Sequence, residues 1–204
     1  KKTFRQLVDQ AHQRGMKIML DAVFNHIGDQ SPQWQDVLKH GEDSVYKDWF
    51  HVQEFPVTKD KLGNPRKLPY HTFAFESYMP KLNTANPQVR NYLLSVATYW
   101  IEEFDIDAWR LDVANEVDHQ FWRDFRKAVL AKKPDLYILG EVWHTSQPWL
   151  NGDEFHAVMN YPLSDSIKDY FLRGVKKTSQ FIDEINGQSM YYRQQISEVM
   201  FNLL

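Results

Sequence analysis

The sequence predicts an α/β fold, specifically an incomplete (β/α)8 TIM barrel with a small domain inserted after one of its strands. Short apolar runs alternate with helical patterns along the 204 residues, which indicates parallel βαβ units. Polar residues stand at the C-terminal ends of several runs, where barrels carry their active sites. No glycine-rich phosphate loop follows any run, which disfavours a doubly wound nucleotide-binding sheet. We expect five strands here, so a closed barrel needs about three more from outside the chain.

The first expected elements are a helix and a buried strand. Apolar residues recur at helical spacing near the start of the chain: Phe4, Leu7, Val8 and Ala11. Gly15 then ends the helical pattern, and the apolar run 16–23 is typical of a buried parallel strand. Residues 1–26 are therefore expected to form one segment of the barrel.

Residues 27–82 lose this regularity and carry five prolines among many aromatic residues. A structureless loop of that length is unusual inside a compact domain, so we expect a small inserted domain over this range. The aromatic residues of the insertion are expected mainly to supply its core.

Regular patterns return over residues 83–204, the second expected barrel segment. Asn86 and Pro87 form a typical N-cap and first helical position, and the helix should continue to about residue 104. The remaining expected elements are strands at 106–112, 136–141, 155–160 and 199–204, and helices at 117–131, 164–173 and 178–194.

Composition limits the possible partners. A net charge of −3 argues against a broad nucleic-acid or membrane surface, since both favour basic faces. No cysteine is present, so no disulfide framework fixes a compartment, and neither a signal peptide nor a membrane-spanning run is visible. Because Lys1 lies inside a helical pattern and the last residues are strand-like, we expect an internal segment of a longer protein.

Three acidic residues, Asp21, Asp112 and Glu141, fall at or near the ends of expected strands. Parallel barrel strands open on one face, so these carboxylates are expected to be neighbours. A glycosidase needs two such groups, one ionised to attack the anomeric carbon and one protonated to release the leaving oxygen. A single strand-end acid is as well explained as a helix cap, but three on different strands favour a function. Arg110 lies two residues before Asp112, so both side chains face one way and Arg110 can hold that carboxylate ionised.

Other candidate residues are weaker on sequence alone. His26 follows the first strand, where a lone histidine is more often structural than catalytic. Trp143 stands two residues past Glu141 and is the best candidate for stacking on a sugar face. No cluster has metal-ligand spacing, and no nucleophile elbow begins a Ser/His/acid triad, so we expect no metal or cofactor in this chain.

Four motifs in order resemble those of the α-amylase family of glycoside hydrolases, and within it the neopullulanase, cyclomaltodextrinase and maltogenic amylase group. The motifs are Asp21-Ala-Val-Phe-Asn-His26, Met79-Pro-Lys-Leu-Asn83, Trp109-Arg-Leu-Asp-Val-Ala-Asn-Glu-Val117 and Glu141-Val-Trp-His144. The resemblance spans the whole chain. It implies strands 3 to 7 of the barrel, with helix 2 and strand 3 in residues 1–26, domain B in 27–82, and helix 3 to strand 7 in 83–204.

The resemblance also implies roles for individual residues. Asp112 would be the nucleophile and Glu141 the general acid/base, with Arg110 orienting Asp112. His26 would hydrogen-bond the sugar at the cleavage subsite. The residues expected to line the leaving-group side are Asn115, Glu116, Trp143, His144 and Tyr161, with Glu116 influencing the choice of acceptor.

The implied activity is retaining, endo-type hydrolysis of α-1,4-glucosidic bonds in cyclodextrins, maltooligosaccharides or pullulan, with possible transglycosylation. The parent protein is expected in the cytoplasm and as a possible homodimer. Calcium is possible in the parent, because Asn25 lies where some amylases bind it, but carboxylate partners are not evident.

The sequence departs from the family pattern in two ways. Ala108 stands where the family commonly has glycine, which is a small change. The third catalytic acid of the family lies beyond Leu204, so the chain alone is expected to be inactive. Two alternatives stay open: an oligo-1,6-glucosidase-like enzyme, which typically has Gln-Pro-Asp-Leu-Asn at 79–83, and a non-catalytic barrel subunit, which usually lacks the catalytic acids.

Overall fold

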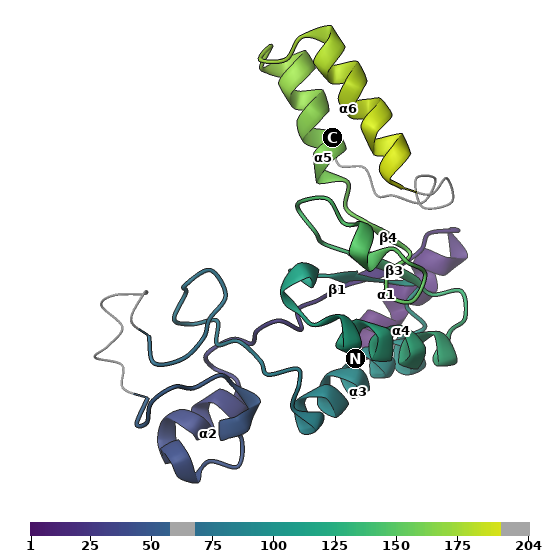
Figure 1. Cartoon of the computed structure of the whole chain (residues 1–204). Coiled ribbons are helices and arrows are strands. Elements are labelled where there is room, and N and C mark those ends of the chain that lie inside the picture. Colours follow the sequence, from purple (N-terminus) through teal and green to yellow (C-terminus); the bar gives the residue numbers. More distant parts are fainter. Residues whose placement is uncertain (58–67, 193–204) are drawn as a thin grey trace.

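The computed structural model describes residues 1–57 and 68–192, and its centre is a four-stranded parallel sheet (Figure 1). The strands follow each other in chain order across the sheet. They are β1 (Met19–Ala22), β2 (Ala108–Leu111), β3 (Tyr137–Gly140) and β4 (Ala157–Val158). Sequential parallel neighbours linked by helices are the arrangement of a barrel segment. The expectation of parallel βαβ units is therefore confirmed.

Three helices connect and cover these strands: α1 (Lys2–Gln13), α3 (Pro87–Phe104) and α4 (His119–Lys132). The Asn86 side chain accepts from the Gln88 N–H at 2.8 Å, and Pro87 occupies the first helical position, as expected. Helix α4 begins two residues later than expected because Asp118 caps it, accepting from the Phe121 N–H at 2.8 Å. Phe24, which follows β1, packs in the core with apolar side chains of α3 and α4, among them Leu93, Ile101, Phe121, Trp122, Phe125 and Val129.

The segment between β1 and α3 lies to one side of the sheet (Figure 1), and its buried apolar residues belong to the same core cluster as those of the barrel segment. Its helical elements are α2 (Pro32–His40), η1 (Gly41–Asp43) and η2 (Lys47–Trp49). Trp34 is almost fully buried and packs against the rings of Phe50 and Tyr70. The rest of the described part of this segment is held by isolated antiparallel bridges. Buried aromatic residues therefore pack between the short helices and bridges of this segment, as expected for most of its aromatics.

The C-terminal part differs from the expected elements in several boundaries. The strand expected at 155–160 is only Ala157–Val158, because Phe155 turns into the core and Asn160 already caps the next helix. That helix, α5 (Tyr161–Ile167), continues into the π-helical turn η7 (Lys168–Leu172) and is followed by α6 (Thr178–Tyr191). Helices α5 and α6 form a hairpin that projects from the sheet (Figure 1). The strand expected at 199–204 lies outside the described residues.

A network of ion pairs and hydrogen bonds surrounds Asp107, which directly precedes β2. The Asp107 carboxylate accepts hydrogen bonds from the Ile18 N–H (2.8 Å), Lys17 Nζ (2.9 Å), His12 Nε2 (2.8 Å) and Lys133 Nζ (3.2 Å). Its side chain is only 8% exposed. The network joins α1, β1 and α4 at the end of the sheet opposite to Asp112, so it supports the site without taking part in it.

Candidate active site

The parallel register brings acidic residues to adjacent positions at one end of the sheet. Asp21 in β1 is paired with Arg110 in β2. Asp112 directly follows β2, and its N–H donates to the Ala22 carbonyl at 3.0 Å. Glu141 directly follows β3, and its N–H donates to the Leu111 carbonyl at 2.9 Å. The sheet hydrogen bonds thus continue one residue past each strand and fix both carboxylates side by side.

A single guanidinium group holds all three acids. Arg110 Nη1 donates to Asp21 Oδ1 at 2.8 Å and to Asp112 Oδ1 at 2.6 Å. Arg110 Nη2 lies 2.9 Å from Glu141 Oε1. Because the two nitrogens belong to one planar group, the Asp112 and Glu141 carboxylates face the same small volume. The arginine side chain is 20% exposed, and pairing offsets the cost of burying its charge.

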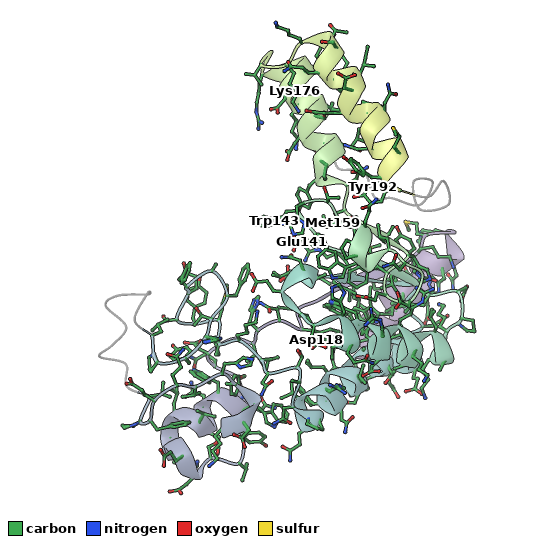
Figure 2. The ribbon with its side chains drawn as sticks, viewed as in Figure 1. Asp118, Glu141, Trp143, Met159, Lys176 and Tyr192 are labelled. Atoms are coloured by element: carbon green, nitrogen blue, oxygen red, sulfur yellow. The ribbon has the colours of Figure 1, made fainter. Side chains whose placement is uncertain are left out.

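Glu141 is the most enclosed of these acids, at 6% exposure, and several donors surround it. The Val113 N–H donates to Oε2 at 3.0 Å, while Trp143 Nε1 donates to Oε1 at 2.9 Å and the Tyr161 hydroxyl at 3.3 Å. Figure 2 shows Glu141 and Trp143 together at the upper edge of the sheet, below the α5–α6 hairpin. Val113 has a positive φ of 47°, which is strained for a β-branched residue. That backbone conformation accompanies the donation of its N–H to Glu141.

A second group of side chains lies beside this centre, where the inserted segment meets the ends of β1 and β2. The His26 ring stacks on Phe73 with centroids 4.8 Å apart and planes 2° from parallel. Glu116, in the short helix η5 (Ala114–Glu116), accepts from Lys81 Nζ at 3.0 Å and from Asn25 Nδ2 at 3.3 Å. The inserted segment therefore contributes Phe73 and Lys81 to the margin of the site.

Comparison with known proteins identifies this arrangement. The family described as "Alpha amylase, catalytic domain" matches residues 1–204 of the chain. The chain belongs to the α-amylase family. It is 60% identical over 201 residues to an intracellular maltogenic amylase of Bacillus subtilis (strain 168), covering 98% of this chain and 33% of that protein. It is 56% identical over 204 residues to a cyclomaltodextrinase of Geobacillus thermopakistaniensis, covering 100% of this chain and 34% of the relative.

Solved structures agree with this membership. A cyclomaltodextrinase structure superposes with a TM-score of 0.93 at 53% identity, over 99% of this chain and 34% of that chain. The parallel sheet is accordingly part of an α-amylase-family TIM barrel that this chain supplies incompletely. The chain spans about a third of the length of the curated relatives named above.

The environment shifts the pKa values of the two central acids of this α-amylase-family site in opposite directions. Burial raises the pKa of Asp112, and the Arg110 guanidinium offsets only part of that rise. Burial also acts to raise the pKa of Glu141, but the Val113 N–H, the Trp143 indole and Arg110 together outweigh it and lower that pKa. Because the two carboxyls interact closely, the proton belongs to the pair rather than to one residue. In the free site, burial thus favours the neutral form of Asp112, whereas the donors around Glu141 favour its ionised form.

Most of the residues predicted from the sequence lie together. Arg110, Asp112, Glu141, Trp143 and Tyr161 form one connected group of hydrogen bonds and ion pairs.

The other predicted residues lie around that group. His26 is 9% exposed, and burial lowers its pKa against the opposing charges of Asp112 and Glu116. Asn115 is exposed in η5 beside Glu116. The Nδ1 atom of His144 lies 3.0 Å from the Thr145 carbonyl oxygen, and the His144 ring is 5.8 Å from that of Trp149.

Sequence reasoning did not assign three of the groups at the site: Lys81, Phe73 and the Val113 N–H. Lys81 lies within the quoted Met79–Asn83 motif, which could have drawn attention to it. Phe73 was one of many aromatics in the insertion. A backbone donor such as the Val113 N–H has no residue type, so no sequence pattern could have revealed it.

A metal centre finds little support in the described part of the chain. Over residues 1–57 and 68–192, no group of three or more His, Cys, Asp or Glu side chains is placed to hold an ion. The buried Asn25 Oδ1 has no hydrogen-bond partner there. However, the neighbouring Glu116 carboxylate already pairs with the Lys81 ammonium, which disfavours a calcium ion at Asn25.

None of the described helices is both long and apolar enough to pass through a membrane.

Proposed function

We propose that the protein hydrolyses α-1,4-glucosidic bonds with retention of anomeric configuration, using Asp112 as nucleophile and Glu141 as general acid/base. The observation that carries this proposal is the Arg110 guanidinium, which bonds both carboxylates at the ends of adjacent parallel strands. Two carboxyls that face one small volume suit the short separation of about 5–5.5 Å used by retaining glycosidases.

In the first step, an Asp112 oxygen bonds to the anomeric carbon as the bond from that carbon to the leaving oxygen breaks. Glu141 gives its proton to the leaving oxygen, and Arg110 orients the attacking carboxylate. In the second step, Glu141 takes a proton from water, the water oxygen bonds to the anomeric carbon, and the bond to Asp112 breaks. Both inversions together retain the α configuration.

His26, held against Phe73, donates to the sugar at the cleavage point in this proposal. The groups proposed to face the leaving-group side are Asn115, Glu116, Trp143, His144 and Tyr161.

The substrate class follows from the relatives. Proteins named maltogenic amylase, cyclomaltodextrinase and neopullulanase are 50–60% identical to this chain. We therefore propose cyclodextrins and maltooligosaccharides as substrates, with pullulan a further one and with transfer to sugar acceptors. We also propose a cytoplasmic location, in line with the relative named intracellular, and a homodimeric assembly. We propose that this part of the protein binds no metal and that neither nucleic acid nor a membrane is a partner.

The configuration of the product tests the reaction class. Proton NMR of the full-length protein acting on β-cyclodextrin or maltotriose should show the α-anomer forming first. A β-anomer as the first product would refute retention.

Azide rescue tests the two roles separately, using p-nitrophenyl α-maltoside, whose leaving group needs no acid. Asp112→Ala with azide should yield the β-maltosyl azide, since azide then attacks in a single displacement. Glu141→Ala with azide should yield the α-maltosyl azide, since the covalent intermediate still forms on Asp112. The reversed pattern would exchange the two roles, and the absence of rescue in both variants would refute the assignment.

A further inference from the structure

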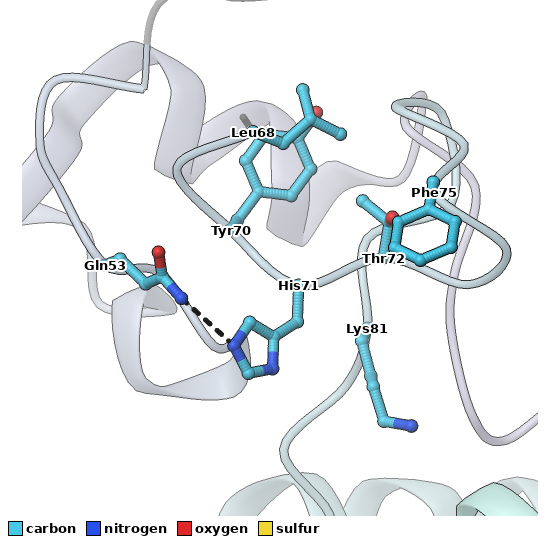
Figure 3. A pocket seen from close by; sticks show the side chains of 7 residues that line it. All are labelled: Gln53, Leu68, Tyr70, His71, Thr72, Phe75 and Lys81. Atoms are coloured by element: carbon cyan, nitrogen blue, oxygen red, sulfur yellow. Dashed lines mark hydrogen bonds between the residues drawn. The ribbon is translucent and has the colours of Figure 1, made fainter. Parts of the chain in front are cut away.

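Lys81 is held firmly at the point where the inserted segment returns to the sheet. Its backbone forms an antiparallel bridge with His26, and its N–H donates to the His71 carbonyl at 2.9 Å. The next residue, Leu82, donates to the Asn25 carbonyl at 3.0 Å. In Figure 3 the Lys81 side chain extends away from Thr72 and Tyr70, at the edge of the pocket that they line. The backbone of Lys81 is therefore fixed relative to the end of β1.

The ammonium group of Lys81 donates two hydrogen bonds to Glu116. Nζ lies 3.2 Å from the Glu116 carbonyl oxygen and 3.0 Å from Oε2, and Asn25 Nδ2 reaches the same Oε2 at 3.3 Å. Among the residues that the structure describes, no donor reaches Oε1 of Glu116. The Lys81 side chain is 23% exposed and that of Glu116 is 37% exposed, so water screens the pair only in part. One carboxylate oxygen is thus fixed by two donors, while the other accepts from none of the described residues, on a half-exposed side chain beside the candidate active site.

We propose that Lys81 is a positioning residue that holds Glu116 so that its free oxygen accepts a hydrogen bond from an incoming sugar hydroxyl. This inference rests on the proposed function. In the transfer step, a sugar hydroxyl replaces water: its oxygen bonds to the anomeric carbon, the bond to Asp112 breaks, and Glu141 takes the hydroxyl proton. Holding the Glu116 carboxylate in one orientation lowers the entropy lost when the acceptor binds. Lys81 therefore favours transfer over hydrolysis.

A purely structural ion pair would behave differently. If Lys81 only tied the inserted segment to the barrel, its loss would lower thermal stability and change hydrolysis and transfer by the same factor. A positioning residue instead changes the ratio of transfer to hydrolysis, raises the KM for the acceptor, and loses its effect when Glu116 has already been neutralised.

The test uses the full-length protein with β-cyclodextrin as donor and glucose as acceptor, and measures both rates against glucose concentration. The variants are Lys81→Met, Lys81→Arg, Glu116→Gln and the Lys81→Met/Glu116→Gln double variant. Lys132→Met is the matched control, because it removes a surface lysine of α4 that is paired with Glu102 of α3.

Lys81→Met should lower the transfer-to-hydrolysis ratio by roughly threefold, mainly through a higher acceptor KM. Glu116→Gln should lower the ratio at least as much, and the double variant should match Glu116→Gln alone. Lys81→Arg should recover most of the ratio, and Lys132→Met should equal the wild type.

The role of Lys81 would be overturned if the double variant lowered the ratio by the product of the two single effects, or if Lys81→Met lowered both rates equally. Neither result would contradict the proposed hydrolase function. A wild type that hydrolyses β-cyclodextrin without any transfer would also overturn the role of Lys81. A wild type without hydrolysis of β-cyclodextrin or maltotriose would overturn the proposed function itself, and the role of Lys81 with it.

Discussion

Replacing Gly140 by alanine should destabilise the protein because no room exists for a methyl group at the end of β3. A Cβ built on Gly140 would lie 2.5 Å from both Cδ2 and Cε2 of the Phe155 ring, whereas ordinary contact begins at 3.4 Å. Phe155 is 1% exposed and packs edge to face on Trp122 at 5.3 Å, so the ring cannot swing into solvent. Either the ring or the strand must move by about 1 Å, and overpacking of a tight core by one methyl costs about 1–3 kcal/mol.

Urea unfolding of the full-length Gly140→Ala variant should show a free energy of unfolding lower by about 2 kcal/mol, with an unchanged m-value. Because Glu141 is the next residue, kcat should fall as well, since the end of β3 sets the position of that carboxylate. Gly28→Ala is the matched control, because a Cβ there meets nothing within 4 Å. If Gly140→Ala were as stable and as active as Gly28→Ala, the steric argument would be wrong.

Three further substitutions have defined outcomes. Asp107→Asn should lower the free energy of unfolding by about 3 kcal/mol at pH 7. Donors outweigh burial and depress the pKa of Asp107, so this difference from the wild type should shrink as the pH falls below about 4 in a pH series of urea unfolding curves. Trp143→Phe removes a donor to the ionised Glu141, so the apparent pKa of the acidic limb of the kcat/KM pH profile should rise. An unchanged apparent pKa would show that Glu141 does not control this limb. Asn86→Ala should lower the free energy of unfolding by about 1 kcal/mol in thermal unfolding, because α3 loses its cap. Asn86→Asp should keep most of that stability, because aspartate can cap the helix as well.

The sheet and the main acids could be predicted from the sequence because both depend on local periodicity. A strand places alternate side chains on one side, so Arg110 and Asp112 were expected to face together, and the structure pairs them at 2.6 Å. Parallel strands end at one edge, which placed Glu141 beside them. The helix start at Asn86 was predicted from its side-chain cap, whereas the cap at Asp118 was not recognised and the helix was expected from residue 117.

What the sequence did not show depends on packing between distant segments. The apolar run beginning at Phe155 looked like a full strand, but the space left by Gly140 draws that ring into the core and shortens the strand. Similarly, nothing near Lys81 in the chain indicates that Glu116 lies opposite to it, because 35 residues separate them. The positive φ of Val113 is a third case, since β-branched residues normally avoid that conformation.

The hydrogen bonds around Glu141 suit the second half of the proposed reaction better than the first. A general acid must carry a proton, yet the Val113 N–H, Trp143 and Arg110 favour the ionised form of Glu141. Once Asp112 is bonded to the sugar, its negative charge is gone, and the loss of a neighbouring charge lowers the pKa of Glu141 further. An ionised Glu141 is then the base that takes a proton from water or from an acceptor hydroxyl. The first step instead requires the proton on Glu141 and an ionised Asp112, so in this proposal the reaction starts from that arrangement of the pair.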